Sequence, residues 1–141
     1  MISILFVCTG NICRSPMAEA IARDRLGTAA TVASAGTRGL TGRQATPEAV
    51  TAAREAGVDL SGHSARRLDA AMLDAADHVY VMTRSHLEDI RSAFGDVPAH
   101  VELLHPDGYD IVDPYGEPLT AYRQARDRIE EAITARVPEW S

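Results

Sequence analysis

The sequence predicts an α/β fold, a single three-layer domain in which helices cover both faces of a four-stranded parallel sheet. Short apolar segments alternate with longer segments of helical spacing, and a length of 141 residues suits one domain over residues 1–141. The first apolar segment runs directly into a Gly-Asn turn. Because ligands of such sheets bind at the carboxyl ends of the strands, the residues after each strand are the candidates for function.

Four short apolar segments have the composition of buried strands. They are rich in β-branched side chains and are bounded by turn residues. Each is separated from the next by a helical segment, which is why a parallel sheet is expected. The predicted strands cover residues 2–7, 30–36, 77–82 and 100–104.

The helical segments are recognised by their start and stop signals. Pro16 falls in the first turn of the first helix, and the second helix has Thr46 as N-cap, Pro47 at its first position and Gly57 as its stop. The last helix spaces Leu119, Tyr122, Ile129, Ile133 and Val137 for one buried face. The predicted helices cover residues 16–26, 47–56, 68–76, 85–95 and 118–137.

The composition excludes several classes of protein. A net charge of -6 argues against general nucleic-acid binding, and no stretch approaches the roughly 20 apolar residues of a membrane span. A disulfide between Cys8 and Cys13 would close a very short loop, so a reducing, cytoplasmic location is expected. The five histidines are scattered and predict no metal site, and no cofactor is expected. We expect a monomer or a weak dimer without nucleic-acid or membrane partners.

The turn after the first strand, residues 8–14, has the features of an anion-binding loop and is called the anion loop below. Backbone N–H groups between a strand end and a helix start point into one cavity, where the helix dipole adds about half a positive charge. Gly10 and Asn11 tolerate the left-handed conformations that such a loop needs. In that environment a cysteine such as Cys8 is expected to ionise readily, and Arg14 is expected to hold two oxygens of a bound anion. The alternative for Cys8 is a small buried apolar residue at a strand end.

At this point the sequence resembles a known family. "VCTGNICRSPMAEA" at 7–20 is similar to the signature of the low-molecular-weight protein-tyrosine phosphatases, Cys-x5-Arg-Ser near the N-terminus. "ASAGT" at 33–37, "GHSARRL" at 62–68, "ADHVYVM" at 76–82 and "DPYG" at 113–116 follow in the family's order, so the resemblance covers nearly the whole chain. It implies a sheet of order 2-1-3-4.

The resemblance implies a role for each residue of the anion loop. Cys8 would attack phosphorus to form a cysteinyl-phosphate that water hydrolyses, Arg14 would hold the phosphoryl oxygens, and Ser15 would stabilise the thiolate as leaving group. These roles agree with an activated nucleophile in a preorganised anion site. The implied substrate-binding residues are Thr9, Gly10, Asn11, Ile12, Cys13, Ser15, Leu40 and Tyr115.

The long segment 105–118, called the aspartate loop below, supplies the proton donor that a phenolate leaving group requires. By chemistry alone, any of Asp107, Asp110 and Asp113 could serve. The resemblance selects Asp113, because "DPY" matches the family's general acid. Asp107 and Asp110 are then interpreted as turn residues.

The resemblance also implies a group of residues that support the anion loop. Asn11, Ser34 and His63 match a hydrogen-bond network that holds the loop's shape, although a histidine such as His63 is by itself more often a surface or core residue. Arg66 falls on a recurrent arginine of the family, with a solvated basic patch as the alternative. Cys13 has two open interpretations, a redox guard that forms a reversible disulfide with Cys8, or a small residue that fits.

The predicted reaction releases inorganic phosphate from phosphotyrosine in proteins. Ile12, which presents an apolar surface to an aromatic ring, favours phosphotyrosine, whereas the protein-arginine phosphatase branch has threonine there. "QATPEAV" and "DPYGEPLTAYRQARDRIEE" resemble that branch, so arginine phosphatase is the alternative. Leu40, the single Tyr115 and Thr83 also depart from the eukaryotic pattern and leave a rim with few aromatic side chains.

Two further functions share this kind of loop. A thiol-linked arsenate reductase needs cysteines downstream of Cys13, and the sequence has none. A phosphoryl-carrier module needs neither Arg14 nor an acid such as Asp113. Both functions are therefore weaker interpretations than a phosphatase.

Overall fold

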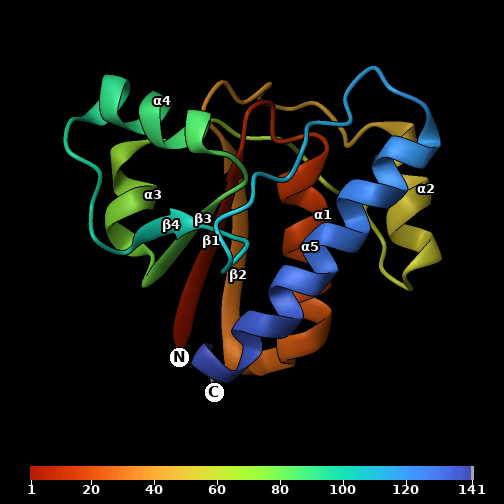
Figure 1. Cartoon of the computed structure of the whole chain (residues 1–141), viewed down its shortest axis with the longest axis horizontal. Helices are drawn as coiled ribbons and strands as arrows, with labels where there is room; N and C mark the ends of the chain where they lie inside the picture. Colours follow the sequence, from red (N-terminus) through yellow and green to blue (C-terminus); the bar gives the residue numbers. More distant parts are fainter. Residues whose placement is uncertain (141) are drawn as a thin grey trace.

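A four-stranded parallel sheet of order β2-β1-β3-β4 forms the centre of the computed structural model, which describes residues 1–140 (Figure 1). The strands are β1 (Ile2–Cys8), β2 (Ala30–Gly36), β3 (His78–Val81) and β4 (Val101–Leu103). The register pairs Cys8 with Gly36 at the carboxyl ends of β1 and β2. The predicted fold class and strand order are confirmed.

Strand β1 lies in the middle of the sheet and is buried on both faces. Its side chains alternate, with Phe6 and Cys8 packing in one core cluster and Leu5 and Val7 in the other. A strand buried on both faces must be apolar throughout, which explains the uninterrupted apolar run before Cys8.

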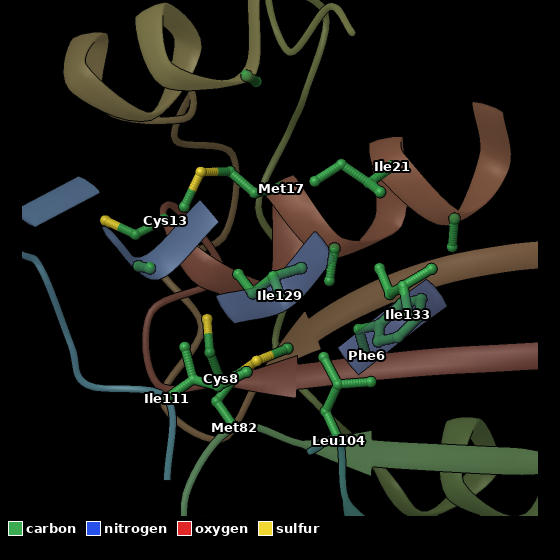
Figure 2. Packing of buried hydrophobic residues seen from close by; sticks show 14 of the residues in the cluster. Phe6, Cys8, Cys13, Met17, Ile21, Met82, Leu104, Ile111, Ile129 and Ile133 are labelled. Carbon is green, nitrogen blue, oxygen red and sulfur yellow. The ribbon is translucent and has the colours of Figure 1, made fainter. Parts of the chain in front are cut away.

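Helices cover both faces of the sheet. On one face lie α1 (Arg14–Leu26), α2 (Pro47–Glu55) and α5 (Leu119–Trp140), and on the other lie α3 (Ala70–Ala75) and α4 (Arg84–Phe94) (Figure 1). Figure 2 shows the larger core between the sheet, α1 and α5, with Cys8 at the tip of β1 and Met82 and Ile111 beside it. The nucleophile candidate thus lies where the core meets the carboxyl edge of the sheet.

Some helix bounds differ from the prediction. Helix α1 begins at Arg14, so Pro16 still falls in the first turn, and a short 3-10 helix, η1 (Gly27–Ala29), follows it. Helix α5 continues past Pro138 to Trp140, whose indole N–H donates to the hydroxyl of Tyr80 at 2.9 Å. That contact with β3 stabilises a helix end that proline alone would be expected to terminate.

The final helix buries most of its predicted apolar face. Tyr122, Ile129 and Ile133 are buried, and Leu119 and Val137 are partly buried against the same cluster. In the part of the chain that the structure describes, no helix has both the length and the apolarity to cross a bilayer.

Candidate active site

The anion loop leaves the tip of β1 and enters α1 with its carbonyl groups pointing outward. Each carbonyl from Cys8 to Ile12 accepts a hydrogen bond from a neighbouring segment, and no peptide bond in the described chain is cis. Because C=O and the following N–H of a trans peptide point in opposite directions, the N–H groups of residues 9–13 face the interior of the loop. The outer donors are the backbone N–H groups of Thr37, Arg38, Leu40 and Thr46 and the ring Nε2 of His63.

Cys8 lies at the base of this ring of N–H groups. Its Sγ atom is 2.9 Å from the Ser15 hydroxyl oxygen, and both side chains are buried. The amide of Asn11 donates to that same oxygen at 2.8 Å. The Ser15 hydroxyl, which accepts from Asn11, can donate its proton to the Cys8 sulfur when that sulfur is a thiolate.

Asn11 is the centre of the hydrogen-bond network around the loop. It is fully buried, and within residues 1–140 it is the one non-glycine residue with positive φ, at 60°. Its Nδ2 also donates to Ser34 Oγ at 2.9 Å, its Oδ1 accepts from the backbone N–H of Arg66 at 2.9 Å, and its carbonyl accepts from His63 Nε2 at 2.7 Å. The structure therefore brings Ser34 and His63 together through Asn11.

Arg66 and Glu19 complete that network. Arg66 donates from Nε to the carbonyl of Ser34 at 3.0 Å, so its side chain is bound to β2 as well as exposed. Glu19 of α1 accepts from Ser34 Oγ at 2.7 Å. The sequence analysis did not identify Glu19, because nothing in the helical segment around it indicated a contact with Ser34.

Arg14 is buried at the start of α1 and reaches the aspartate loop. Its Nη1 donates to the carbonyl of Ile111 at 2.8 Å, and its Nη2 lies 3.5 Å from Asp113 Oδ2. Its Nε is buried and has no hydrogen-bond partner among the described residues. The guanidinium is thus fixed by the protein while Nε–H can still donate to an oxygen.

The structure separates the three candidate acids. Asp113 is half exposed beside Arg14, and its Oδ1 accepts from the backbone N–H of Tyr115 at 3.0 Å. Asp110 accepts from the backbone N–H of Arg84 at 3.0 Å, and Asp107 lies exposed in a turn. Of the three, only Asp113 is placed next to the guanidinium.

The two residues expected at the rim of the site, Leu40 and Tyr115, are exposed. Leu40 is 39% exposed and Tyr115 57% exposed, and a side-chain atom added at Gly10 would lie 3.5 Å from both Leu40 and Ile12. Ile12 itself is only 3% exposed, because it packs into the main core cluster. The apolar surface that the sequence assigned to Ile12 is therefore provided mainly by Leu40 and Tyr115.

Cys13 contacts two residues, Thr46 and Tyr122, that line a cavity of about 640 Å³ together with Tyr115. Its Sγ is 3.6 Å from Thr46 Oγ1 and 3.7 Å from the hydroxyl of Tyr122. Burial raises the pKa of the Cys13 thiol above its usual value, and burial also raises the pKa of Tyr122 to about 12. Cys13 is a neutral thiol at physiological pH, and both cysteines are free.

His86, which the sequence analysis did not single out, contacts the anion loop at Thr9. It is buried in the first turn of α4, with Nε2 3.0 Å from Thr9 Oγ1. Its Nδ1 accepts from the backbone N–H of Thr83 at 3.1 Å. A histidine in the first turn of a helix that follows a strand end was the available signal. Among residues 1–140, no cluster of His, Cys, Asp and Glu side chains is arranged to bind a metal ion.

One known protein family matches nearly the whole described chain. The family model described as "Low molecular weight phosphotyrosine protein phosphatase" matches residues 3–138. The chain is 39% identical over 137 residues to the "Probable low molecular weight protein-tyrosine-phosphatase EpsP" of Ralstonia nicotianae, covering 96% of this chain and 94% of that protein.

A second relative has a different substrate. The chain is 39% identical over 137 residues to the protein-arginine-phosphatase of Bacillus subtilis, covering 92% of this chain and 91% of that one. Among solved structures, Vibrio vulnificus Wzb in complex with benzylphosphonate superposes with a TM-score of 0.93 at 32% identity and covers 98% of both chains.

Proposed function

The chain belongs to the low molecular weight phosphotyrosine protein phosphatase family, and we propose that it hydrolyses phosphotyrosine in proteins through a cysteinyl-phosphate intermediate. The observation that supports this most directly is the anion loop itself, whose outward carbonyls leave a ring of N–H groups around the buried Cys8 sulfur. A tetrahedral dianion matches such a ring in size and charge.

In the first step, the Cys8 thiolate attacks phosphorus and the bond from phosphorus to the phenolic oxygen breaks. Asp113 gives its proton to the departing oxygen, since a phenolate is a poor leaving group at neutral pH. Arg14 and the loop N–H groups hold the phosphoryl oxygens while charge spreads over them. The half-exposed position of Asp113, beside Arg14, suits a group that must meet the substrate.

In the second step, water attacks phosphorus of the cysteinyl-phosphate. The carboxylate of Asp113 accepts a proton from the water, and the bond between sulfur and phosphorus breaks. The Ser15 hydroxyl, 2.9 Å from Sγ, stabilises the thiolate as it leaves. Inorganic phosphate is released and Cys8 is again a thiolate.

The rim supports phosphotyrosine as substrate. Leu40, next to Gly10 of the anion loop, and Tyr115, bonded through its backbone N–H to Asp113, offer exposed apolar surface on which a phenyl ring can pack. The protein-arginine-phosphatase of Bacillus subtilis has the same 39% sequence identity to this chain as the Ralstonia nicotianae protein. Phosphoarginine is therefore the second candidate substrate. The two substrates differ in the group beyond the phosphorus, which would meet the rim residues Leu40 and Tyr115. Ile12 is buried and would influence the choice through its packing within the anion loop.

The deciding experiment compares kcat/KM on a phosphotyrosine peptide and on a phosphoarginine peptide of the same sequence. We expect wild type to prefer phosphotyrosine by about tenfold or more, and Ile12→Thr to lower that ratio. Cys8→Ser serves as the control for spontaneous hydrolysis of the labile phosphoarginine. A wild-type preference for phosphoarginine would make the protein an arginine phosphatase and this proposal wrong.

Two alternatives to a hydrolase are a phosphoryl carrier and a thiol-linked arsenate reductase. Multiple turnovers of para-nitrophenyl phosphate with stoichiometric release of phosphate are expected of a hydrolase and not of a phosphoryl carrier. Thiol-linked arsenate reduction needs further cysteines that pass on a disulfide, and no cysteine follows Cys13 in this sequence. The cytoplasmic location, the single-domain organisation and the monomeric or weakly dimeric state stay predictions.

A further inference from the structure

We propose that His86 is a positioning residue of the active site, which holds Thr9, the residue directly after the nucleophile, through an imidazole fixed as the Nε2–H tautomer. The kinetic consequence rests on the proposed phosphatase function, whereas the tautomer and its contact do not. The two atoms that carry the contact, His86 Nε2 and Thr9 Oγ1, lie 3.0 Å apart.

The tautomer follows from the other ring nitrogen. The backbone N–H of Thr83 points at Nδ1 of His86 at 3.1 Å, and a backbone N–H is always a donor. Nδ1 must therefore be the acceptor, and the single proton of the neutral ring lies on Nε2. Nε2–H then donates to Thr9 Oγ1, which keeps its own hydroxyl proton for another acceptor.

The environment of His86 keeps the ring neutral. The side chain is 1% exposed, and burial together with the nearby Arg14 guanidinium lowers the pKa of His86 to about 4. The carboxylates of Asp89, Asp113 and Asp110 act in the opposite direction and are outweighed. A second ring proton would lie on Nδ1 and point at the Thr83 N–H, which is also a donor. The neutral Nε2–H tautomer therefore persists through the physiological pH range.

Helix α4 also contacts Thr37, the residue whose backbone N–H binds the carbonyl of Cys8. Thr37 donates its backbone N–H to that carbonyl at 2.9 Å, and its hydroxyl donates to Asp89 Oδ2 at 3.3 Å. His86 and Asp89 are three residues apart, so they lie on the same face of the helix. This face therefore contacts the anion loop through Thr9 and the segment after β2 through Thr37.

The same turn of α4 also holds the aspartate loop. The backbone N–H of Arg84 donates to Asp110 Oδ1 at 3.0 Å, and Arg84 Nη2 donates to the carbonyl of Gly108 at 2.7 Å. The first turn of α4 thus contacts both the loop that contains the nucleophile and the loop that contains Asp113. His86 is the member of this turn that touches the anion loop.

The tautomer is tested by nitrogen-15 NMR of the histidine rings in the full chain. We expect one ring to have a protonated Nε2 and an unprotonated Nδ1 at pH 7, to stay neutral down to about pH 5, and to vanish in His86→Asn. A His86 ring with its proton on Nδ1, or one that titrates near pH 6.5, would overturn the proposal. This measurement needs no turnover, so it remains decisive if the proposed phosphatase function fails.

The contact is tested by a double-mutant cycle on para-nitrophenyl phosphate. Asn at position 86 can reach the Thr83 N–H but not Thr9, whereas Gln can reach Thr9. We expect His86→Asn and Thr9→Val each to lower kcat/KM by about tenfold, the double variant to lose no more than the worse single variant, and His86→Gln to retain more activity than His86→Asn.

His100→Gln provides the matched control, because that ring bonds the carbonyl of Leu73 near the opposite edge of the sheet. It is expected to keep wild-type kcat/KM. Losses that multiply in the double variant, or a His86→Asn variant with wild-type kcat/KM, would overturn the positioning role. A wild-type protein without any turnover would instead refute the proposed function and leave the NMR result to decide on His86.

Discussion

The guanidinium of Arg14 and the carboxylate of Asp113 lie 3.5 Å apart, joining the loop after β1 to the loop before α5. Arg14 is buried and is also bonded to the carbonyl of Ile111, whereas Asp113 is half exposed. The buried partner therefore fixes the position of the exposed one. A group held in this way can face both the anion loop and an approaching substrate.

Asp113→Asn is expected to slow hydrolysis according to the leaving group. Without a proton donor, kcat/KM on phenyl phosphate, which reports the steps up to cysteinyl-phosphate formation, should fall by about 10²–10⁴, with a smaller loss of kcat/KM for para-nitrophenyl phosphate, whose phenolate leaves more easily. The affinity for inorganic phosphate should change little. Asp107→Asn is the control, since Asp107 lies exposed in a turn. Equal losses of kcat/KM on both esters would contradict the assignment of Asp113 as the acid.

Asn11 combines a left-handed backbone with buried hydrogen bonds, and two substitutions separate these contributions. Asn11→Gly keeps the φ of 60° accessible but removes the bonds to Ser15, Ser34 and Arg66. We expect it to lower the free energy of unfolding by about 1–3 kcal/mol and to raise KM. Asn11→Ala should cost about 1 kcal/mol more, because alanine is strained at positive φ. Urea unfolding of both variants measures the difference, and equal stabilities would show that the backbone strain is unimportant.

Gly36 lies against the back of the anion loop, where no side chain fits. A Cβ atom there would lie 2.3 Å from the Thr9 carbonyl oxygen and 2.9 Å from the Asn11 nitrogen, both backbone atoms. Gly36→Ala should therefore displace the loop, lower stability by about 1–3 kcal/mol and abolish most turnover. Gly62→Ala is the matched control, because nothing lies within 4 Å of its Cβ position. A fully active Gly36→Ala enzyme would contradict the proposed geometry.

The two cysteines should differ in reactivity although both are buried. Burial raises the pKa of Cys13, so its thiolate is scarce at pH 7 and below, and it becomes reactive only as pH rises through that higher value. We expect iodoacetamide at pH 7 to label Cys8 first, phosphate to slow that labelling, and Cys13 to react only after unfolding. Peptide mass spectrometry measures both sites. Preferential labelling of Cys13 in the native protein would refute this prediction.

The sequence predicted the strands and most of the helices because their signals are local. Apolar runs mark the strands, and Thr46 and Gly57 bound α2 much as expected. The final helix was predicted to end at Val137, the last residue of its apolar spacing, whereas it continues to Trp140, whose indole N–H donates to Tyr80. That bond joins residues far apart in the chain, which a local pattern does not encode.

By itself, the sequence determined the order of elements and the anion loop, because strand, turn and helix start are contiguous from residue 2 to residue 26. Only the tertiary structure decided which aspartate lies beside Arg14, that Ile12 is largely buried, and that His86 contacts Thr9. Each of these depends on the packing of segments that are distant in the chain. Hydrogen bonds and burial between such segments are set by the relative placement of sheet, helix and loop, and that placement exists only in the folded chain.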